Sequence, residues 1–357
     1  MSAARQRGRA LATSFFVLLF LGAAAAALGY HYLERQYLAP GPQEQVTRIE
    51  VTPGSSLRSV LNNLQAQGTV RDARAVTWWL RLKHQQVRVE AGVYEIPAHA
   101  SAQAILALFA EGKVVLEQLT VVEGATFAEF LAALDAHPAV AHTLRGKSAA
   151  AVMAALGHTG AGAEGRFFPD TYRFAANTSD AAVLALAYEA MQRALGAAWE
   201  SRAPGLPFER PEQALILASM VEKEAQLKSE RALIAGVFIE RLRKGMRLQS
   251  DPTVIYGLGE KYDGTIHTRD LQADNPYNTY TREGLPPGPI ALPGRESLIA
   301  AVHPDESGAL YFVATGAGDG AHHFSKTLEE HNAAVQAYLA RLRAQSRPGA
   351  GAAAAHR

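Results

Sequence analysis

Two glutamates near the end of an apolar segment are the residues of this sequence best suited to acid–base chemistry. Residues 214–224 read ALILASMVEKE, so Glu222 and Glu224 follow an almost wholly apolar run. In a helix of about 100° per residue, Glu224 lies roughly 20° from Leu217, whereas Glu222 lies roughly 140° from it. Glu224 is therefore expected on the buried face, where burial disfavours the charged form and raises the pKa of a carboxyl. A glutamate that keeps its proton near neutral pH can serve as a general acid.

A competing interpretation is that both glutamates are solvated at the fraying end of a helix, as charged residues near helix ends usually are. The segment that follows favours an active site instead. An amphipathic helix is predicted to end near Lys244, with Gly245 at its C-terminal cap. The polar residues from Gln249 to Thr253 are then predicted to form a turn around Pro252. A buried acid, a helix and a polar turn in this order indicate an active site.

The sequence resembles the endolytic murein transglycosylases, the MltG or YceG-like family, and the resemblance covers nearly the whole chain. The motifs that carry it are EGRFFPDTY (164–172), ASMVEKE (218–224), SER (229–231), RLQSDPTVIYG (247–257), YNTY (277–280) and GLPPGPI (284–290). They occur in the order that the family has. The catalytic glutamate of the family is the second acid of the EKE element, so the resemblance implies that Glu224 is catalytic. The helical geometry selects the same residue independently.

The resemblance implies a lytic reaction on peptidoglycan that needs one acid, whereas most glycosidases need two carboxylates. Glu224 would protonate the oxygen between N-acetylmuramic acid and N-acetylglucosamine. It would then take the proton of the muramic C6 hydroxyl, which attacks C1 and closes a 1,6-anhydro ring without consuming water. No cofactor is expected. No metal is expected either, because the histidines at 303, 322, 323 and 331 lack an HExxH motif or other close ligand spacing.

Polar residues near Glu224 in the folded chain would support the oxocarbenium-like transition state and the sugar rings. The candidates for substrate binding are Gln249, Asp251, Tyr277, Asn278 and Tyr280. Tyr280 could stack on a sugar ring. Structural roles are also open for two of them, because Asp251 can cap a turn before Pro252 and Asn278 can hold a loop.

Two other functions are left open by the sequence. Asp170 together with Glu224 would allow a hydrolase with two carboxylates. A well exposed Glu224 away from any groove would instead favour a non-enzymatic, membrane-tethered protein that binds the cell wall and organises synthases. Peptidoglycan strands and peptidoglycan synthases (penicillin-binding proteins) are the expected partners under the resemblance.

The N-terminus predicts a membrane anchor. Arginines at positions 5, 7 and 9 precede an apolar, uncharged run, and residues 10–32 are long enough to cross a bilayer as one helix. The positive-inside rule keeps residues 1–9 in the cytoplasm and exports the rest, which places the chain in a bacterial inner membrane. A cleaved signal peptide is the alternative, but the run exceeds a signal core of roughly 7–15 residues. An aromatic belt at the outer interface is expected from Tyr30, Tyr32 and Tyr37.

An α+β organisation follows from a repeated strand–turn–helix pattern, which recurs at residues 51–64, 94–109 and 121–134. Ser or Thr side chains are expected to cap the helices. We expect a linker at 33–48 and a disordered tail at 346–357. The family resemblance implies that residues 49–120 are a LysM-like subdomain and residues 121–345 a mixed YceG-like catalytic domain. Of Trp78 and Trp79, one is expected to be buried and the other half-exposed.

The composition excludes several classes of function. With 357 residues the chain can hold two or three domains, and 35 basic against 34 acidic residues give a net charge of +1. Nucleic acid is therefore not an expected partner. The absence of cysteine excludes disulfides and thiolate metal sites.

Overall fold

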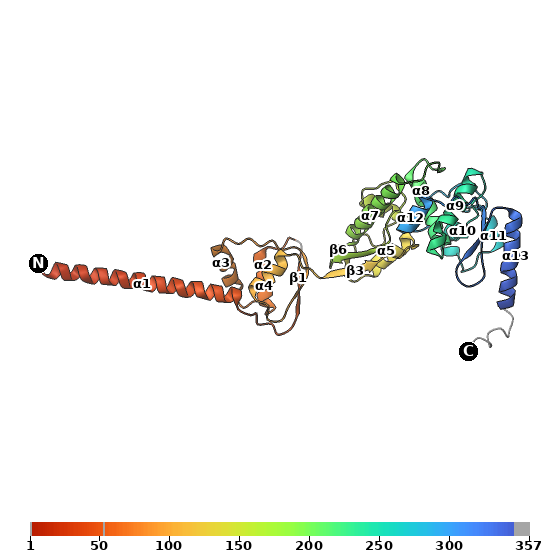
Figure 1. The fold of residues 1–357 in the computed structure, drawn as a ribbon. Helices are drawn as coiled ribbons and strands as arrows, with labels where there is room; N and C mark the ends of the chain where they lie inside the picture. The colour runs from red at the N-terminus through yellow and green to blue at the C-terminus, as the bar shows by residue number, and fades with distance from the viewer. Residues whose placement is uncertain (1, 53, 346–357) are drawn as a thin grey trace. The chain divides into compact units, whose positions relative to one another are not determined.

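The computed structural model describes residues 2–52 and 54–345 and shows a mixed α+β chain (Figure 1). Two compact units can be distinguished, and each is described by itself. The N-terminal unit comprises Met1–Glu117 and Phe174–Asn177, and the C-terminal unit comprises Gln118–Arg173 and Thr178–Arg357. The predicted subdomain boundary at residue 120 thus lies three residues from the boundary of the first unit. The tail at 346–357 lies outside the described residues.

The first helix, α1 (Ser2–Leu38), contains the predicted anchor and is longer than predicted. Its part from Ser14 to Leu38 is long and apolar enough to cross a membrane, judged by length and composition. The segment predicted as a linker from residue 33 is helical up to Leu38, because Leu33 and Tyr37 share one face and pack on the core of the N-terminal unit. The prediction of a free aromatic belt is wrong for Tyr37, whose ring is buried 5.8 Å from that of Trp79.

The rest of the N-terminal unit is a small sheet with three further helices. Its strands are β1 (Thr47–Val51) and β2 (Gly92–Ile96), which pair in antiparallel register, and its helices are α2 (Leu57–Ala66), α3 (Ala73–Leu82) and α4 (Ala102–Ala110). Ser56 and Ser101 cap α2 and α4, as the repeated pattern predicts. Trp79 is 5% exposed and Trp78 is 60% exposed, which confirms the prediction for this pair.

The chain passes between the two units in the paired strands β3 (Leu116–Thr120) and β5 (Thr171–Ala175). The following elements of the C-terminal unit are α5 (Phe127–Ala136), β4 (Val140–Ala141), α6 (Ala149–Ala155), β6 (Thr178–Ser179) and α7 (Asp180–Glu200). A capping box of Thr126 and Glu129 starts α5, again at the position that the repeated pattern predicts. The strands β4 and β6 pair in parallel.

The core of the C-terminal unit is a packed set of helices around α8 (Pro211–Glu224). Helix α8 lies against α9 (Arg231–Arg243), α12 (Arg295–Val302) and α7, and a short 3₁₀ turn, η1 (Lys228–Glu230), precedes α9 (Figure 1). Leu217, Met220 and Val221 are fully buried in this core. The apolar run that marks the sequence therefore becomes the central helix that carries Glu222 and Glu224 at its C-terminal end.

The segment predicted as a polar turn begins a helix instead. Helix α10 (Asp251–Leu258) has Ser250 at its N-cap and Pro252 in its first turn, where a missing backbone N–H removes no helical hydrogen bond. Short helical turns follow at η2 (Gly259–Lys261) and α11 (Thr268–Gln272), and residues 273–294 form a long loop. The unit ends with the antiparallel hairpin β7 (Tyr311–Ala314) and β8 (His322–Ser325) and with α13 (Leu328–Gln345).

Candidate active site

Glu224 is the last residue of α8, and its side chain is half-buried. The Ser250 hydroxyl donates a hydrogen bond of 2.6 Å to Glu224 Oε1. The pKa of the Glu224 carboxyl is raised to about 7. Burial is the main cause and the negative charge of Asp251 adds to it, whereas the Ser250 hydrogen bond and the charges of His322 and Arg241 oppose the rise. A carboxyl in this state can both release and accept a proton near neutral pH.

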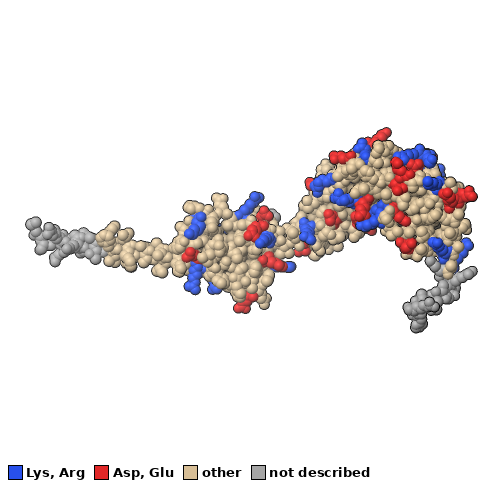
Figure 2. Space-filling model, in the orientation of Figure 1, with Lys and Arg blue, Asp and Glu red and all other residues tan. Residues whose placement is uncertain are grey.

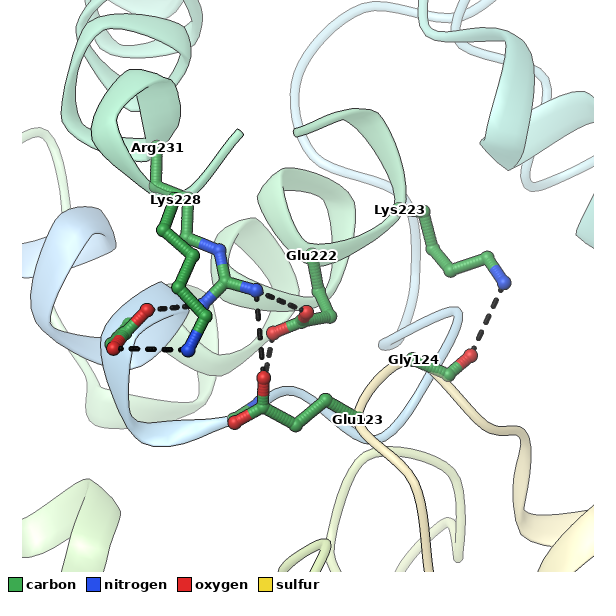
Figure 3. A network of polar contacts seen from close by, with 8 residues as sticks. Glu123, Gly124, Glu222, Lys223, Lys228 and Arg231 are labelled. Carbon is green, nitrogen blue, oxygen red and sulfur yellow. Dashed lines mark hydrogen bonds and ion pairs between the residues drawn. The ribbon is translucent and has the colours of Figure 1, made fainter. Parts of the chain in front are cut away.

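Glu222, two residues earlier, is part of an ion-pair network (Figure 3). Its side chain is 5% exposed and accepts hydrogen bonds from Arg231 Nη2 at 2.7 Å and from the Gly294 N–H at 2.9 Å. Arg231 also pairs with Glu296 at 3.0 Å and with Glu123 at 3.5 Å. Glu222 thus lies away from the face of Leu217, and Arg231 from α9 covers this flank of the helix. The interpretation of both glutamates as solvated helix-end residues is therefore excluded.

Two of the predicted substrate-binding residues meet beside Glu224. The Tyr280 hydroxyl donates to Asp251 Oδ1 at 2.5 Å, and the charges of Asp251 and Glu224 act on each other. Burial raises the pKa of the Tyr280 hydroxyl, so it remains a donor over the whole neutral range. Asp251 itself is exposed at the start of α10.

Gln249 lies just before Ser250 in a backbone conformation that favours glycine, with φ at 52°. Its N–H donates to the Thr279 carbonyl at 3.1 Å, and the Ser250 N–H donates to the Thr279 hydroxyl at 2.9 Å. Residues other than glycine in this region carry about 1–3 kcal/mol of strain and are concentrated at functional sites. The strained residue turns the chain so that the Ser250 hydroxyl reaches Glu224, while the Gln249 side chain is exposed.

Asn278 holds the loop in place. Asn278 is 1% exposed. Its side-chain amide donates hydrogen bonds to the backbone carbonyls of residues 270, 271 and 273. Its side-chain oxygen accepts from the Tyr280 N–H at 2.9 Å, which connects it to the position of Tyr280. Tyr277 is half-buried, with its ring 4.8 Å from that of Tyr256.

Three residues of this site have roles that the sequence did not predict. Ser250 and Thr279 were ordinary polar residues in the sequence, although the position of Ser250 before an Asp-Pro pair is typical of an N-cap. Arg241 is the third of these residues and lies near the end of α9. It is 7% exposed, and its guanidinium donates at 2.7 Å to each of the Leu248 and Leu310 carbonyls.

Glu164, in the motif EGRFFPDTY, is a second acid with a pKa raised by burial. Its Oε1 accepts from the Phe127 N–H at 3.0 Å, and its Oε2 accepts from the Tyr256 hydroxyl at 3.2 Å. Asp170 from the same motif accepts from the Thr171 N–H at 2.7 Å, at the start of β5. Glu164 therefore links the start of α5 to α10, and Asp170 has a local backbone partner.

Among the described residues, the acids and histidine that lie close enough together to hold a metal ion are Asp135, His142 and Asp180. Asp180 already accepts from the Thr143 N–H and hydroxyl, and from the Leu144 and Ala181 N–H groups. Donors of the chain thus occupy this carboxylate, and we assign no ion to the group.

A surface cavity of about 440 Å³ lies beside the end of α8. Its lining includes Glu123, Gly124 and Lys223, and the Lys223 ammonium donates to the Gly124 carbonyl at 3.1 Å (Figure 3).

Acidic and basic side chains are interspersed over the visible surface of each unit, in keeping with the net charge of +1 (Figure 2).

Comparison with known proteins finds similarity over most of the chain. Residues 49–337 match the YceG-like family. An endolytic murein transglycosylase of Bacillus subtilis is 49% identical over 125 residues, which are 35% of this chain and 34% of the relative. One of Streptococcus pneumoniae is 26% identical over 93% of this chain and 65% of the relative. The chain thus spans less than two thirds of the length of these curated relatives.

A solved structure is also similar. The crystal structure of a yceG-like protein from Listeria monocytogenes is 30% identical, with a TM-score of 0.51, over 81% of this chain and 98% of that chain. The residues that match the YceG-like family, 49–337, include the helices and loops that surround Glu224.

Proposed function

The chain belongs to the YceG-like family, and from this premise we propose that it is a lytic transglycosylase that cleaves the glycan strands of peptidoglycan. The observation that carries the proposal is the half-buried Glu224, with its pKa near 7 and its hydrogen bond from Ser250. Endolytic murein transglycosylase is also the name of the two relatives described above.

The proposed reaction uses the Glu224 carboxyl twice. Its proton goes to the oxygen between N-acetylmuramic acid and N-acetylglucosamine, and the bond from that oxygen to C1 breaks. The muramic C6 oxygen then forms a bond to C1, and its proton returns to the Glu224 carboxylate. The enzyme is restored, water is not consumed, and the new end is a 1,6-anhydro sugar. A pKa near 7 suits both steps, because a group whose pKa lies near the operating pH can both donate and accept a proton without a large energetic penalty.

The neighbouring residues support this reaction in different ways. We assign Asp251 and Tyr280 to contacts with the sugar and the developing positive charge, since they meet beside Glu224. The exposed Gln249 side chain and the half-buried Tyr277 ring remain proposed substrate contacts. For Asn278, its backbone hydrogen bonds favour an indirect role, in which it holds Tyr280 in position.

A hydrolase with two carboxylates is a second candidate, because Asp251 lies close enough to raise the pKa of Glu224. In that reaction Asp251 would activate a water molecule or attack C1. The hydrogen bond from Tyr280 to Asp251 favours the lytic route, since it engages one oxygen of the base that the hydrolase would need.

The proposed location is a bacterial inner membrane, with α1 as a single anchor and residues 1–9 in the cytoplasm. The apolar stretch of α1 and the arginines before it support this orientation. The family resemblance leads to three further proposals. They are a LysM-like role for the N-terminal unit, sugar binding by that unit and an association with peptidoglycan synthases.

Analysis of the reaction products tests the proposal directly. We expect the detergent-solubilised full-length chain to release fragments that end in 1,6-anhydro-N-acetylmuramic acid from peptidoglycan strands. These ends resist borohydride reduction, and internal cuts would give fragments of many lengths. Full-length protein is required because Tyr37 of α1 is part of the core of the N-terminal unit. Reducible muramic acid ends as the main product would identify a hydrolase, and Asp251→Asn would then be the first variant to measure.

A further inference from the structure

A histidine and a glutamate that are 92 residues apart form a close pair in the C-terminal unit. His322 Nδ1 lies 2.7 Å from Glu230 Oε2, and the His322 N–H donates to Glu230 Oε1 at 2.9 Å. Their side chains are 13% and 11% exposed. An ionised carboxylate only accepts hydrogen bonds, so the pairing places a proton on Nδ1 and fixes the orientation of the ring.

The β7–β8 hairpin that carries His322 lies against the segment that follows Glu224. Gly320, in the turn of the hairpin, has φ at 72°, and a Cβ atom there would lie 2.8 Å from Gln226 Oε1 and 3.2 Å from Gln226 Cβ. Phe312 and Phe324 anchor the hairpin against the helical core. The close approach of Gly320 to Gln226 and the pair with Glu230 together hold His322 beside residues 226–230, the segment that follows the end of α8.

His322 differs from the other groups whose charge acts on Glu224. Those groups are Arg241 from α9 and Asp251 from the start of α10, and Tyr280 from the loop interacts with the same charge. Arg241 keeps its charge and donates to two backbone carbonyls, and Asp251 accepts from Tyr280. The charge of His322 opposes that of Asp251 in its effect on Glu224. Of these groups, His322 is the one whose side chain is held by another acid, Glu230.

We propose that His322, held by Glu230, is a positioning residue of the lytic reaction, whose imidazolium stabilises the Glu224 carboxylate formed once the proton has left. This inference rests on the proposed function. The carboxylate must persist until it receives the proton of the C6 hydroxyl, and a nearby positive charge favours it during that interval. Glu230 keeps the ring in place and compensates its charge, as the orienting acid does in other histidine–carboxylate pairs.

The first test compares pH–rate profiles of His322→Gln and His323→Gln. His323 is the exposed neighbour on the same strand and serves as the matched control. Loss of the imidazolium should lower kcat about tenfold and move the alkaline limb about one pH unit higher, because Glu224 then keeps its proton to higher pH. KM should stay unchanged. A lower kcat with an unmoved alkaline limb would mean that His322 is only structural, and the inference would be wrong.

Glu230→Gln gives an independent variant of the same pair. The alkaline limb of its pH–rate profile should move to higher pH, as in His322→Gln. The double variant of both residues should be no slower than either single variant, because the two residues act as a unit. Thermal unfolding of each variant identifies any loss of folded protein. Additive losses in the double variant would overturn the pairing.

A titration without substrate separates this inference from the proposed function. Carboxyl ¹³C NMR of protein labelled at glutamate, with Glu224→Gln to assign the signal, gives the midpoint for Glu224. The midpoint should rise by about one unit in His322→Gln and stay unchanged in His323→Gln. An unchanged midpoint in both variants overturns the inference whether or not the chain cleaves glycan. A wild-type chain that shows the expected midpoints without cleaving peptidoglycan would reject the proposed function alone.

Discussion

The Ser250 hydroxyl and Glu224 Oε1 are joined by a hydrogen bond of 2.6 Å that connects the start of α10 to the end of α8. This bond favours the carboxylate, whereas burial, which is the larger influence, favours the protonated acid. The balance leaves the pKa of Glu224 at about 7, so a small change in either influence changes which form predominates at neutral pH.

Replacing Ser250 by alanine should therefore raise the pKa of Glu224. A hydrogen bond to a charged group contributes about 1.5–3 kcal/mol, so the alkaline limb of the pH–rate profile should move up by about one to two units. The plateau rate should fall, because the carboxylate that forms when the proton leaves Glu224 loses a hydrogen bond that stabilises it. Ser229→Ala, an exposed serine in the following turn, is the control and should leave the profile unchanged. A Ser250→Ala profile equal to that of the wild type would show that the bond does not tune Glu224.

The sequence predicted the residue at the centre of this candidate site and its neighbours Asp251 and Tyr280, but not Ser250 or His322. Glu224 could be chosen because helical periodicity relates it to Leu217, which is fully buried as expected. Ser250 and His322 could not be chosen, because their relation to Glu224 depends on contacts between elements that are far apart in the chain. Asn278 illustrates the same limit, since only the structure shows that its amide is used by loop carbonyls.

The fold was predictable where local signals define an element. A Ser or Thr residue caps each helix of the repeated segments as predicted, at Ser56, Ser101 and Thr126, because a capping side chain acts within three residues of itself. The polar run before Pro252 was misinterpreted, since Asp and Pro favour both turns and the first turn of a helix. The helical extension through Tyr37 depends on its packing on Trp79, which the sequence alone does not reveal.

Glu224 should destabilise the fold at alkaline pH. Its folded pKa of about 7 lies above the ordinary 4.5, so its favourable contribution is complete below pH 4.5 and is lost as the pH rises through 7. This shift corresponds to at most about 3 kcal/mol, reduced by the solvent that reaches a half-buried group. Glu224→Gln should therefore be more stable than the wild type at pH 8 and equally stable at pH 4. Thermal unfolding at both pH values measures this, and a stability difference that is the same at both would contradict the shifted pKa.

Glu222→Gln should lower the stability of the fold and retain activity, which is the opposite of the result expected for Glu224→Gln. It is therefore the matched control for that variant. The substitution removes one charge of a buried pair and leaves Arg231 with the half-exposed Glu123 and Glu296 as acidic partners. We expect a loss of about 3 kcal/mol, the lower end for a broken buried pair, because these two acids still compensate Arg231. Activity per folded molecule and the pH–rate profile should be retained, since Glu222 is bound to Arg231 and the Gly294 N–H and holds α8 in place. Measuring unfolding and product formation on the same samples separates the two effects. A Glu222→Gln protein that is as stable as the wild type but inactive, beside an active Glu224→Gln protein, would transfer the catalytic assignment to Glu222.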